Sequence, residues 1–218
     1  ILRGGKETFT TNSTITDIIR KSAESSGLPS DTVQFVSSTD RSLVKQMLNM
    51  DRYIDLIIPR GSSDLVNFVA KNAKMPAITG GVGVCHTFVD KNADLKKALD
   101  IVVNAKVQRH TVCNALDTVL VHQEIAKSFV PQLIEKMILN KVELRVDKKT
   151  LNYVKNKSKY VVLAKSDDYG KEFLALIASV KIVTSIGEAI KHIEKHGSGH
   201  SEAIITENIT DSEMFLNT

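Results

Sequence analysis

The chain has 218 residues, of which 42% are apolar and 25% are charged, and its formal net charge is +4. This length can bury the core of one domain or of two compact halves, and no apolar run approaches the roughly 18 residues that suggest a membrane span. Lysine and arginine are scattered among acidic residues instead of forming a basic stripe with interleaved aromatic residues, which argues against a nucleic-acid partner.

The first half of the chain alternates between short apolar runs and amphipathic stretches. A helix is predicted over residues 14–26, because isoleucines recur there on one helical face and Gly27 can end it. From residue 33 to residue 89 the alternation is typical of the βαβ units of a parallel sheet. The expected strands are 33–36, 54–58, 76–79 and 85–89, and the expected helices are 42–50 and 62–74.

A second α/β unit is predicted in the remaining half. Its expected helices are 94–106, 124–139 and 186–195, and its expected strands are 114–122, 142–145, 160–164, 174–183 and 202–206. The polar stretch 104–111 is the strongest linker candidate. The chain opens at Ile1, without Met, in a run that looks like the end of a strand, and it closes at Thr218 inside a helical pattern. We therefore expect residues to be missing on both sides.

The two cysteines have different surroundings in the sequence. Cys113 lies between a polar, basic segment and an apolar strand, with Lys106, Arg109 and His110 near enough in sequence to favour the thiolate. Cys85 is embedded in an apolar run, which predicts a buried small hydrophobe. Two cysteines in a chain without a signal-like start favour a reducing cytoplasm over a disulfide framework, and their spacing to the histidines fits no four-ligand zinc site.

Three glycine-containing segments could approach an anionic or flat ligand. Arg3 and Lys6 could offer cations to a phosphate, although the residues alone favour a surface turn. Gly61 and Ser62 lie between an apolar strand and a helix start, where an anion site and a simple N-cap are equally good interpretations. Residues 79–86 contain three glycines, but the chain has no GxGxxG fingerprint, so nucleotide binding would need another scheme.

A further glycine-rich segment, His-Gly-Ser-Gly-His, precedes the last predicted strand. It could place His200 at the sheet edge, facing a ligand. The residues alone favour a solvated loop.

Six segments occur in an order that is more specific than any single glycine motif: ILRGGKE, DLIIPRGSS, ITGGVGVCHTFVD, NAKVQRHTVCNALDTVLVH, KEFLALIASVKIV and HGSGHSEAIITE. Together they resemble the γ-glutamyl phosphate reductase branch of the aldehyde dehydrogenase superfamily, and the resemblance covers essentially the whole chain. It implies an α/β fold with a parallel-sheet nucleotide-binding domain over residues 1–103 and an α/β catalytic domain over residues 104–218, both incomplete.

The resemblance also implies an activity, the NADPH-dependent reduction of γ-glutamyl phosphate to glutamate-5-semialdehyde and phosphate in proline biosynthesis. Cys113 matches the family's nucleophile, whose thiolate would attack the acyl phosphate and leave a thioester that accepts hydride. Residues 78–82 carry no carboxylate where hydrolytic aldehyde dehydrogenases have the glutamate that activates water. The thioester would therefore be protected from water.

Site residues follow from the same resemblance, position by position. The residues that match NADP contacts are Arg3, Lys6, Gly61, Ser62, Thr79, Gly80 and Glu172. The residues expected to contact the substrate are Arg109, Asn114 and His200. No metal site is expected.

The resemblance further implies a cytoplasmic homo-oligomer, with glutamate 5-kinase as a candidate partner and with neither nucleic acid nor membrane as a partner. Three alternatives stay open: the reductase half of a bifunctional pyrroline-carboxylate synthase, another semialdehyde dehydrogenase, and a folded fragment without catalysis. The third is included because the family's oxyanion asparagine and its oligomerisation strands are expected to lie outside the 218 residues.

Overall fold

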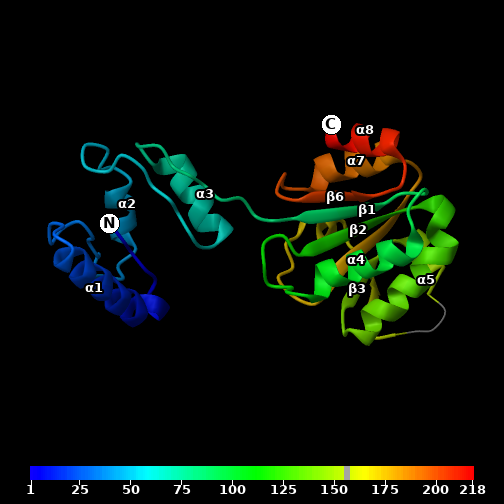
Figure 1. Cartoon of the computed structure of the whole chain (residues 1–218), viewed down its shortest axis with the longest axis horizontal. Helices are drawn as coiled ribbons and strands as arrows, with labels where there is room; N and C mark the ends of the chain where they lie inside the picture. Colours follow the sequence, from blue (N-terminus) through cyan, green and yellow to red (C-terminus); the bar gives the residue numbers. More distant parts are fainter. Residues whose placement is uncertain (155–157) are drawn as a thin grey trace. The chain divides into compact units, whose positions relative to one another are not determined.

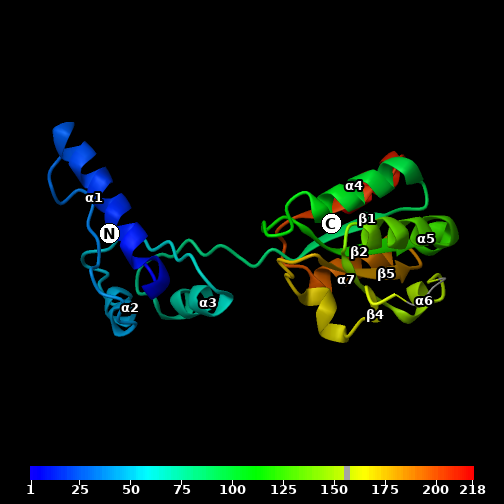
Figure 2. The ribbon, with the colours of Figure 1, turned by 90° about the horizontal axis from the view of Figure 1, so that it is seen from below.

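The computed structural model describes residues 1–154 and 158–218, and the chain divides into two compact units, Ile1–Gly80 and Gly81–Thr218. We call them the first unit and the second unit. Figures 1 and 2 show the elements of each unit. No helix among the described residues is long and apolar enough to cross a membrane.

The first unit is mainly helical. Its helices are η1 (Lys6–Thr8), α1 (Phe9–Ser25), α2 (Ser42–Met47) and α3 (Ser63–Asn72). The strands predicted over 33–36, 54–58 and 76–79 were wrong as strands, because each of these segments pairs at one residue only. The pairs are the parallel bridges Leu2 to Phe35 and Ile57 to Ala77.

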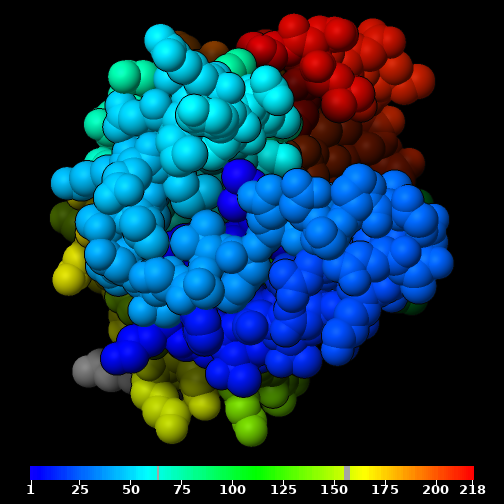
Figure 3. Space-filling view, turned by 90° about the vertical axis from the view of Figure 1, so that its left-hand side faces the viewer, coloured from blue at the N-terminus to red at the C-terminus, as the bar shows by residue number. Residues whose placement is uncertain are grey.

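Helix α1 starts five residues earlier than predicted, at Phe9, whose ring lies 5.6 Å from the ring of Phe35 between centroids. Its isoleucines do share one stripe, but Ile15, Ile18 and Ile19 are 49%, 59% and 44% exposed. The helix forms part of the outer surface of the first unit, in blue in Figure 3. Hydrophobic periodicity thus predicted the helix correctly, but the apolar face that it marks is largely exposed.

The second unit contains a six-stranded sheet in the order β4-β3-β5-β2-β1-β6, and every strand pair is parallel. The strands are β1 (Cys85–Val89), β2 (Leu116–His122), β3 (Glu143–Val146), β4 (Val161–Leu163), β5 (Ile177–Val183) and β6 (Glu202–Ile205). The α/β fold with a parallel sheet, expected from the sequence, is confirmed.

Helices cover both faces of this sheet (Figure 1). They are α4 (Leu95–Val107), α5 (Gln123–Leu139), α6 (Lys148–Leu151), η2 (Ser166–Gly170), α7 (Ile186–His196) and α8 (Ile209–Leu216). Val119 and Val121 of β2 pack toward α4 and α5, whereas Leu120 between them packs toward α7 with Phe88 and Ala189. Because successive side chains of a strand point to opposite faces, the apolar run 119–121 of β2 is buried on both sides of the sheet.

Two sequence-based boundaries of the second unit were wrong. The stretch 104–111 is not a linker throughout, because α4 continues to Val107 and the side chain of Lys106 is fully buried. Strand β5 starts at Ile177, three residues later than predicted, after Leu174 adopts a φ of 48° that no strand residue has.

The division between the units falls after Gly80, whereas the expected domains meet at residue 103. The difference arises because β1 pairs with β2 and β6, and because α4 packs on α5 in the same hydrophobic core. The assignment of nucleotide binding and catalysis to these parts of the chain stays a prediction.

Candidate active site

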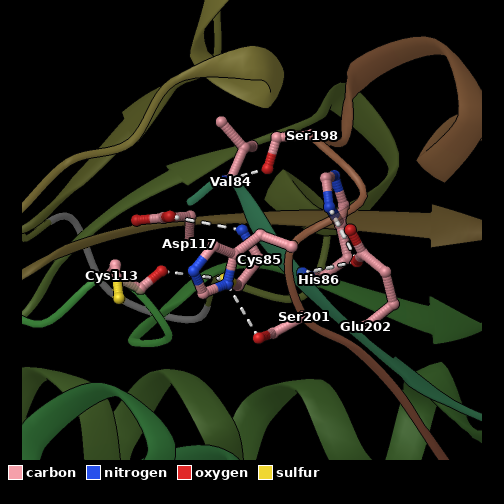
Figure 4. Close-up of polar contacts among 9 residues, drawn as sticks. Val84, Cys85, His86, Cys113, Asp117, Ser198, Ser201 and Glu202 are labelled. Carbon is pink, nitrogen blue, oxygen red and sulfur yellow. Dashed lines mark hydrogen bonds and ion pairs between the residues drawn. The ribbon is translucent and has the colours of Figure 1, made fainter. Parts of the chain in front are cut away.

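The candidate site lies at the edge of the sheet where β1, β2, β5 and β6 begin, which we call the amino edge. Since these strands are parallel, the segments that enter them meet at one edge. The entering segments are residues 81–84, 108–115, 171–176 and 197–201. They bring together residues that lie far apart in the sequence (Figure 4).

The two cysteines meet at this edge in different environments. Cys113 is exposed, whereas Cys85 is buried, as predicted, and both are free thiols. The Cys85 Sγ–H donates to the carbonyl oxygen of Cys113 at 3.2 Å, while the Cys113 sulfur points away from that bond (Figure 4). Burial, together with the nearby carboxylates of Asp117 and Glu202, raises the pKa of the Cys85 thiol to about 11. Of the two, only Cys113 can meet a substrate.

Gly83 connects the nucleophile candidate to Glu172. A Cβ on Gly83 would overlap the backbone carbonyl of Cys113, so these two backbones pack more closely than any other residue would allow. The backbone N–H of Gly83 donates to Glu172 Oε1 at 3.3 Å. Cys113 and Glu172, predicted separately from the sequence, are therefore both neighbours of one glycine.

The segment 197–201 is tied to the start of β1 by side chains. Ser198 Oγ accepts a hydrogen bond from Val84 N–H at 2.9 Å. Glu202 Oε2 accepts one from His86 N–H, also at 2.9 Å, and the exposed His200 places Nδ1 2.9 Å from Ser201 Oγ. The histidine therefore sits in an anchored turn at the amino edge.

Behind the site lies a buried ion pair. Lys106 Nζ is 3.6 Å from Asp117 Oδ1, and the two side chains are 0% and 3% exposed. The expectation that Lys106 assists the Cys113 thiolate needs correction, because its ammonium faces the Asp117 carboxylate within the core. Arg109, also expected there, is exposed.

Comparison with known proteins identifies the family. The family model described as aldehyde dehydrogenase matches residues 3–154, more than half of the chain. The chain belongs to the aldehyde dehydrogenase family.

Within this family the chain is similar to γ-glutamyl phosphate reductases. It is 47% identical over 218 residues to the enzyme of Dehalococcoides mccartyi and 48% identical over 223 residues to the enzyme of Clostridium tetani. Each alignment covers 100% of this chain, but only 51% and 52% of the respective relative. The crystal structure of the Thermotoga maritima protein of that name matches 99% of the chain, and 51% of its own, with a TM-score of 0.93 at 43% identity. The chain thus spans about half the length of the curated relatives it matches.

The predicted site residues of this family member fall into two groups. Cys113, Arg109, Asn114, Glu172 and His200 lie in segments that enter the strands of the second unit, and all but the partly buried Glu172 are exposed. The others lie in the first unit: Arg3, Lys6, Gly61, Ser62, Thr79 and Gly80.

In the first unit, Ser62 is the N-cap of α3 and its Oγ accepts a hydrogen bond from Leu65 N–H at 3.4 Å, so the N-cap interpretation is confirmed. Arg3 Nη2 donates to the carbonyls of Thr39 and Asp40 at 3.0 and 3.3 Å. Lys6 is exposed in η1.

Sequence reasoning missed the residues that hold the amino edge together. Asp117, Ser198 and Glu202 each accept a backbone N–H of another segment. For Asp117 a signal was present, because a carboxylate stands in a strand that is otherwise largely apolar. For the two others the sequence carries no comparable signal.

A cluster of aromatic side chains also lies near the site. The ring of His192 lies 5.6, 4.6 and 5.1 Å between centroids from those of His86, His196 and Tyr169. Burial and the adjacent Lys181 lower the pKa of His192 to about 3, so this imidazole is neutral at physiological pH. The described residues contain no group of three or more His, Cys, Asp or Glu side chains placed to hold a metal ion.

Proposed function

We propose that the full-length protein reduces γ-glutamyl phosphate to glutamate-5-semialdehyde and phosphate, with NADPH as the reductant, in proline biosynthesis. The observation that carries the proposal is the exposed Cys113 at the amino edge, in a chain that matches γ-glutamyl phosphate reductases along its whole length. Cys85 is excluded as the nucleophile because it is buried and protonated at neutral pH.

In the proposed reaction the Cys113 thiolate attacks the acyl carbon, and phosphate leaves with the bonding electrons of the acyl–oxygen bond. The product of this step is a thioester, whose carbonyl accepts hydride readily. When bound, NADPH would supply that hydride, and the resulting hemithioacetal would collapse to release the aldehyde and restore the Cys113 thiolate.

The exposed residues beside Cys113 are proposed to bind the substrate. Arg109 offers a cation to a carboxylate or phosphate of the substrate, and Asn114 and His200 offer hydrogen-bonding groups. Glu172 is proposed to accept a hydrogen bond from the nicotinamide ribose with the oxygen that Gly83 does not engage.

The first unit has groups that fit an anionic dinucleotide. Lys6 presents an exposed ammonium, and Arg3 Nε is buried without a hydrogen-bond partner in the part of the chain that the structure describes. Gly61 and Ser62 precede the ten-residue helix α3, whose N-terminus favours a phosphate. We propose that these residues, with Thr79 and Gly80, hold NADPH.

We also propose, from the resemblance, a cytoplasmic homo-oligomer. Glutamate 5-kinase is the proposed partner, because it would supply an acyl phosphate that is prone to hydrolysis. Size measurement of the purified full-length protein, alone and mixed with the kinase, tests both statements.

Substitution of the nucleophile tests the central proposal. Cys113→Ala and Cys113→Ser in the full-length protein should lower turnover of γ-glutamyl phosphate by several orders of magnitude, as expected for a covalent nucleophile. The matched control is Cys85→Ser, which keeps a donor to the Cys113 carbonyl and should retain most of the activity. Near-normal oxidation of NADPH by Cys113→Ala would overturn the assignment.

A further inference from the structure

Asp117 joins three segments of the amino edge through one carboxylate. Its Oδ2 accepts a hydrogen bond from Cys85 N–H at 3.4 Å, and its Oδ1 accepts one from Phe173 N–H at 3.1 Å. Lys106 Nζ lies 3.6 Å from the same Oδ1. The last turn of α4, the start of β1 and the segment that leads to β5 thus meet at a single buried side chain.

This arrangement is costly to bury. Lys106 is 0% exposed, and its Nζ makes no hydrogen bond within the residues that the structure describes. Burial lowers the pKa of Lys106 and raises the pKa of Asp117, so the surroundings disfavour both charges. An apolar pair of similar volume is often as stable as a buried ion pair, or more so. Stability alone therefore gives no reason for these two side chains.

The segments that Asp117 holds are those that carry the proposed chemistry. Phe173, whose amide it binds, directly follows Glu172. Glu172 in turn accepts the N–H of Gly83, which packs against the carbonyl of Cys113. Asp117 itself lies at the start of β2, four positions after Cys113. A shift of the carboxylate would therefore move the thiol and the Glu172 carboxylate relative to each other.

We infer that Asp117 is a positioning residue for acyl transfer to Cys113, and that Lys106 balances its charge. The inference rests on the proposed function, because it takes Cys113 as the nucleophile. Asp117 acts through backbone amides. A displacement of about 1 Å at a reacting group can lower its rate by about 100-fold.

The test uses the double variant Asp117→Asn/Lys106→Met in the full-length protein. Replacing both residues avoids the unpaired buried charge that either single change would leave. The asparagine amide turns an N–H group toward one of the two backbone donors, so both hydrogen bonds cannot be kept. The matched control is Asp100→Asn/Lys136→Met, which removes an exposed ion pair of 2.7 Å between α4 and α5.

The rates of acylation and of alkylation at Cys113 distinguish the positioning of the thiol from its exposure. Both rates can be followed by mass spectrometry. Acylation by acetyl phosphate needs an oriented thiol and should fall about 100-fold in the Asp117 double variant. Alkylation by iodoacetamide needs an accessible thiolate but no precise orientation toward an acyl group, and should change little. The control variant should leave both rates unchanged, and Cys85 should stay unlabelled in all of them.

Unchanged acylation in the Asp117 double variant would overturn the inference. Slow acylation together with labelling of Cys85 would also overturn it, because the site would then merely have opened. A lack of Cys113 acylation in the unaltered protein would overturn it as well. If acetyl phosphate acylates Cys113 in the unaltered protein but the protein does not reduce γ-glutamyl phosphate with NADPH, the proposed function fails. The comparison of acylation rates between the unaltered protein and the Asp117 double variant still stands in that case.

Discussion

Cys85 and Cys113 illustrate how the same side chain differs in chemistry according to its neighbours. Cys85 opens β1 within the apolar core, beside two carboxylates that disfavour its thiolate. Cys113 lies in an exposed turn and uses only its backbone carbonyl to bind Cys85. The buried thiol therefore helps to place the exposed one.

Thiol labelling should follow this difference. At pH 8, iodoacetamide should modify Cys113 and leave Cys85 unmodified, because a thiol whose pKa is raised to about 11 stays protonated and is shielded as well. The sign of the shift means that Cys85 gains thiolate only as the pH rises toward 11. Peptide mass spectrometry at a series of pH values measures both sites, and equal labelling at pH 8 would contradict the prediction.

Lys6 should distinguish the two nicotinamide cofactors. A hydrogen bond to a charged phosphate is worth about 1.5 to 3 kcal/mol, so Lys6→Glu should raise the Michaelis constant for NADPH by about 10- to 100-fold and that for NADH much less. Steady-state kinetics with each cofactor provide the measurement. Equal effects on both would show that Lys6 does not contact the 2′-phosphate.

At the scale of elements, the parallel sheet explains why the residues of the candidate site meet at the amino edge. Four strands that begin at one edge bring four entering segments together there, and side chains such as Asp117 and Ser198 tie these segments to one another. At Gly83 the backbone of one entering segment packs so closely on the turn before β2 that an added Cβ would overlap the carbonyl of Cys113.

Alanine substitutions in the segment 79–86 should show whether Gly83 is needed for close packing or only for backbone flexibility. Gly83→Ala places a methyl group against the Cys113 carbonyl, so we expect a loss of about 1 to 3 kcal/mol of stability, together with most of the activity. Gly81→Ala is the matched control, because nothing in the described structure lies within 4 Å of its added Cβ. Thermal unfolding and turnover measure the two effects, and similar results for both variants would count against the packing argument.

At the scale of the whole molecule, the two units differ in how much apolar surface they bury. Both clusters of buried hydrophobic residues belong to the second unit, where they fill the two faces of the sheet. Among the described residues of the first unit, the buried apolar side chains are Leu48, Val69 and Met75.

This difference predicts unequal stability. The polypeptide 81–218 should unfold cooperatively on its own, whereas the polypeptide 1–80 should not, because burial of apolar surface is the main favourable term in folding. Circular dichroism during heating of each purified polypeptide tests this. A cooperative transition of 1–80 alone would show that its few buried side chains suffice.

Much of the second unit could be predicted from local patterns. Hydrophobic periodicity placed most of its helices and strands within a few residues, and the apolar neighbours of Cys85 predicted its burial correctly. The first unit was predicted less well, since apolar runs such as 54–58 look like strands whether or not a ladder forms. A strand needs a partner that the run itself does not specify.

The sequence by itself determined most element types of the second unit, the family resemblance and the cysteine that stands in its motif, because these depend on residues close together in the chain. Only the tertiary structure decided the strand order and the contacts at the amino edge. Gly83 and Glu172, for example, are 89 positions apart, and Cys85 and Asp117 are 32 apart. Such contacts arise when parallel strands align, and no local pattern of side chains encodes that alignment.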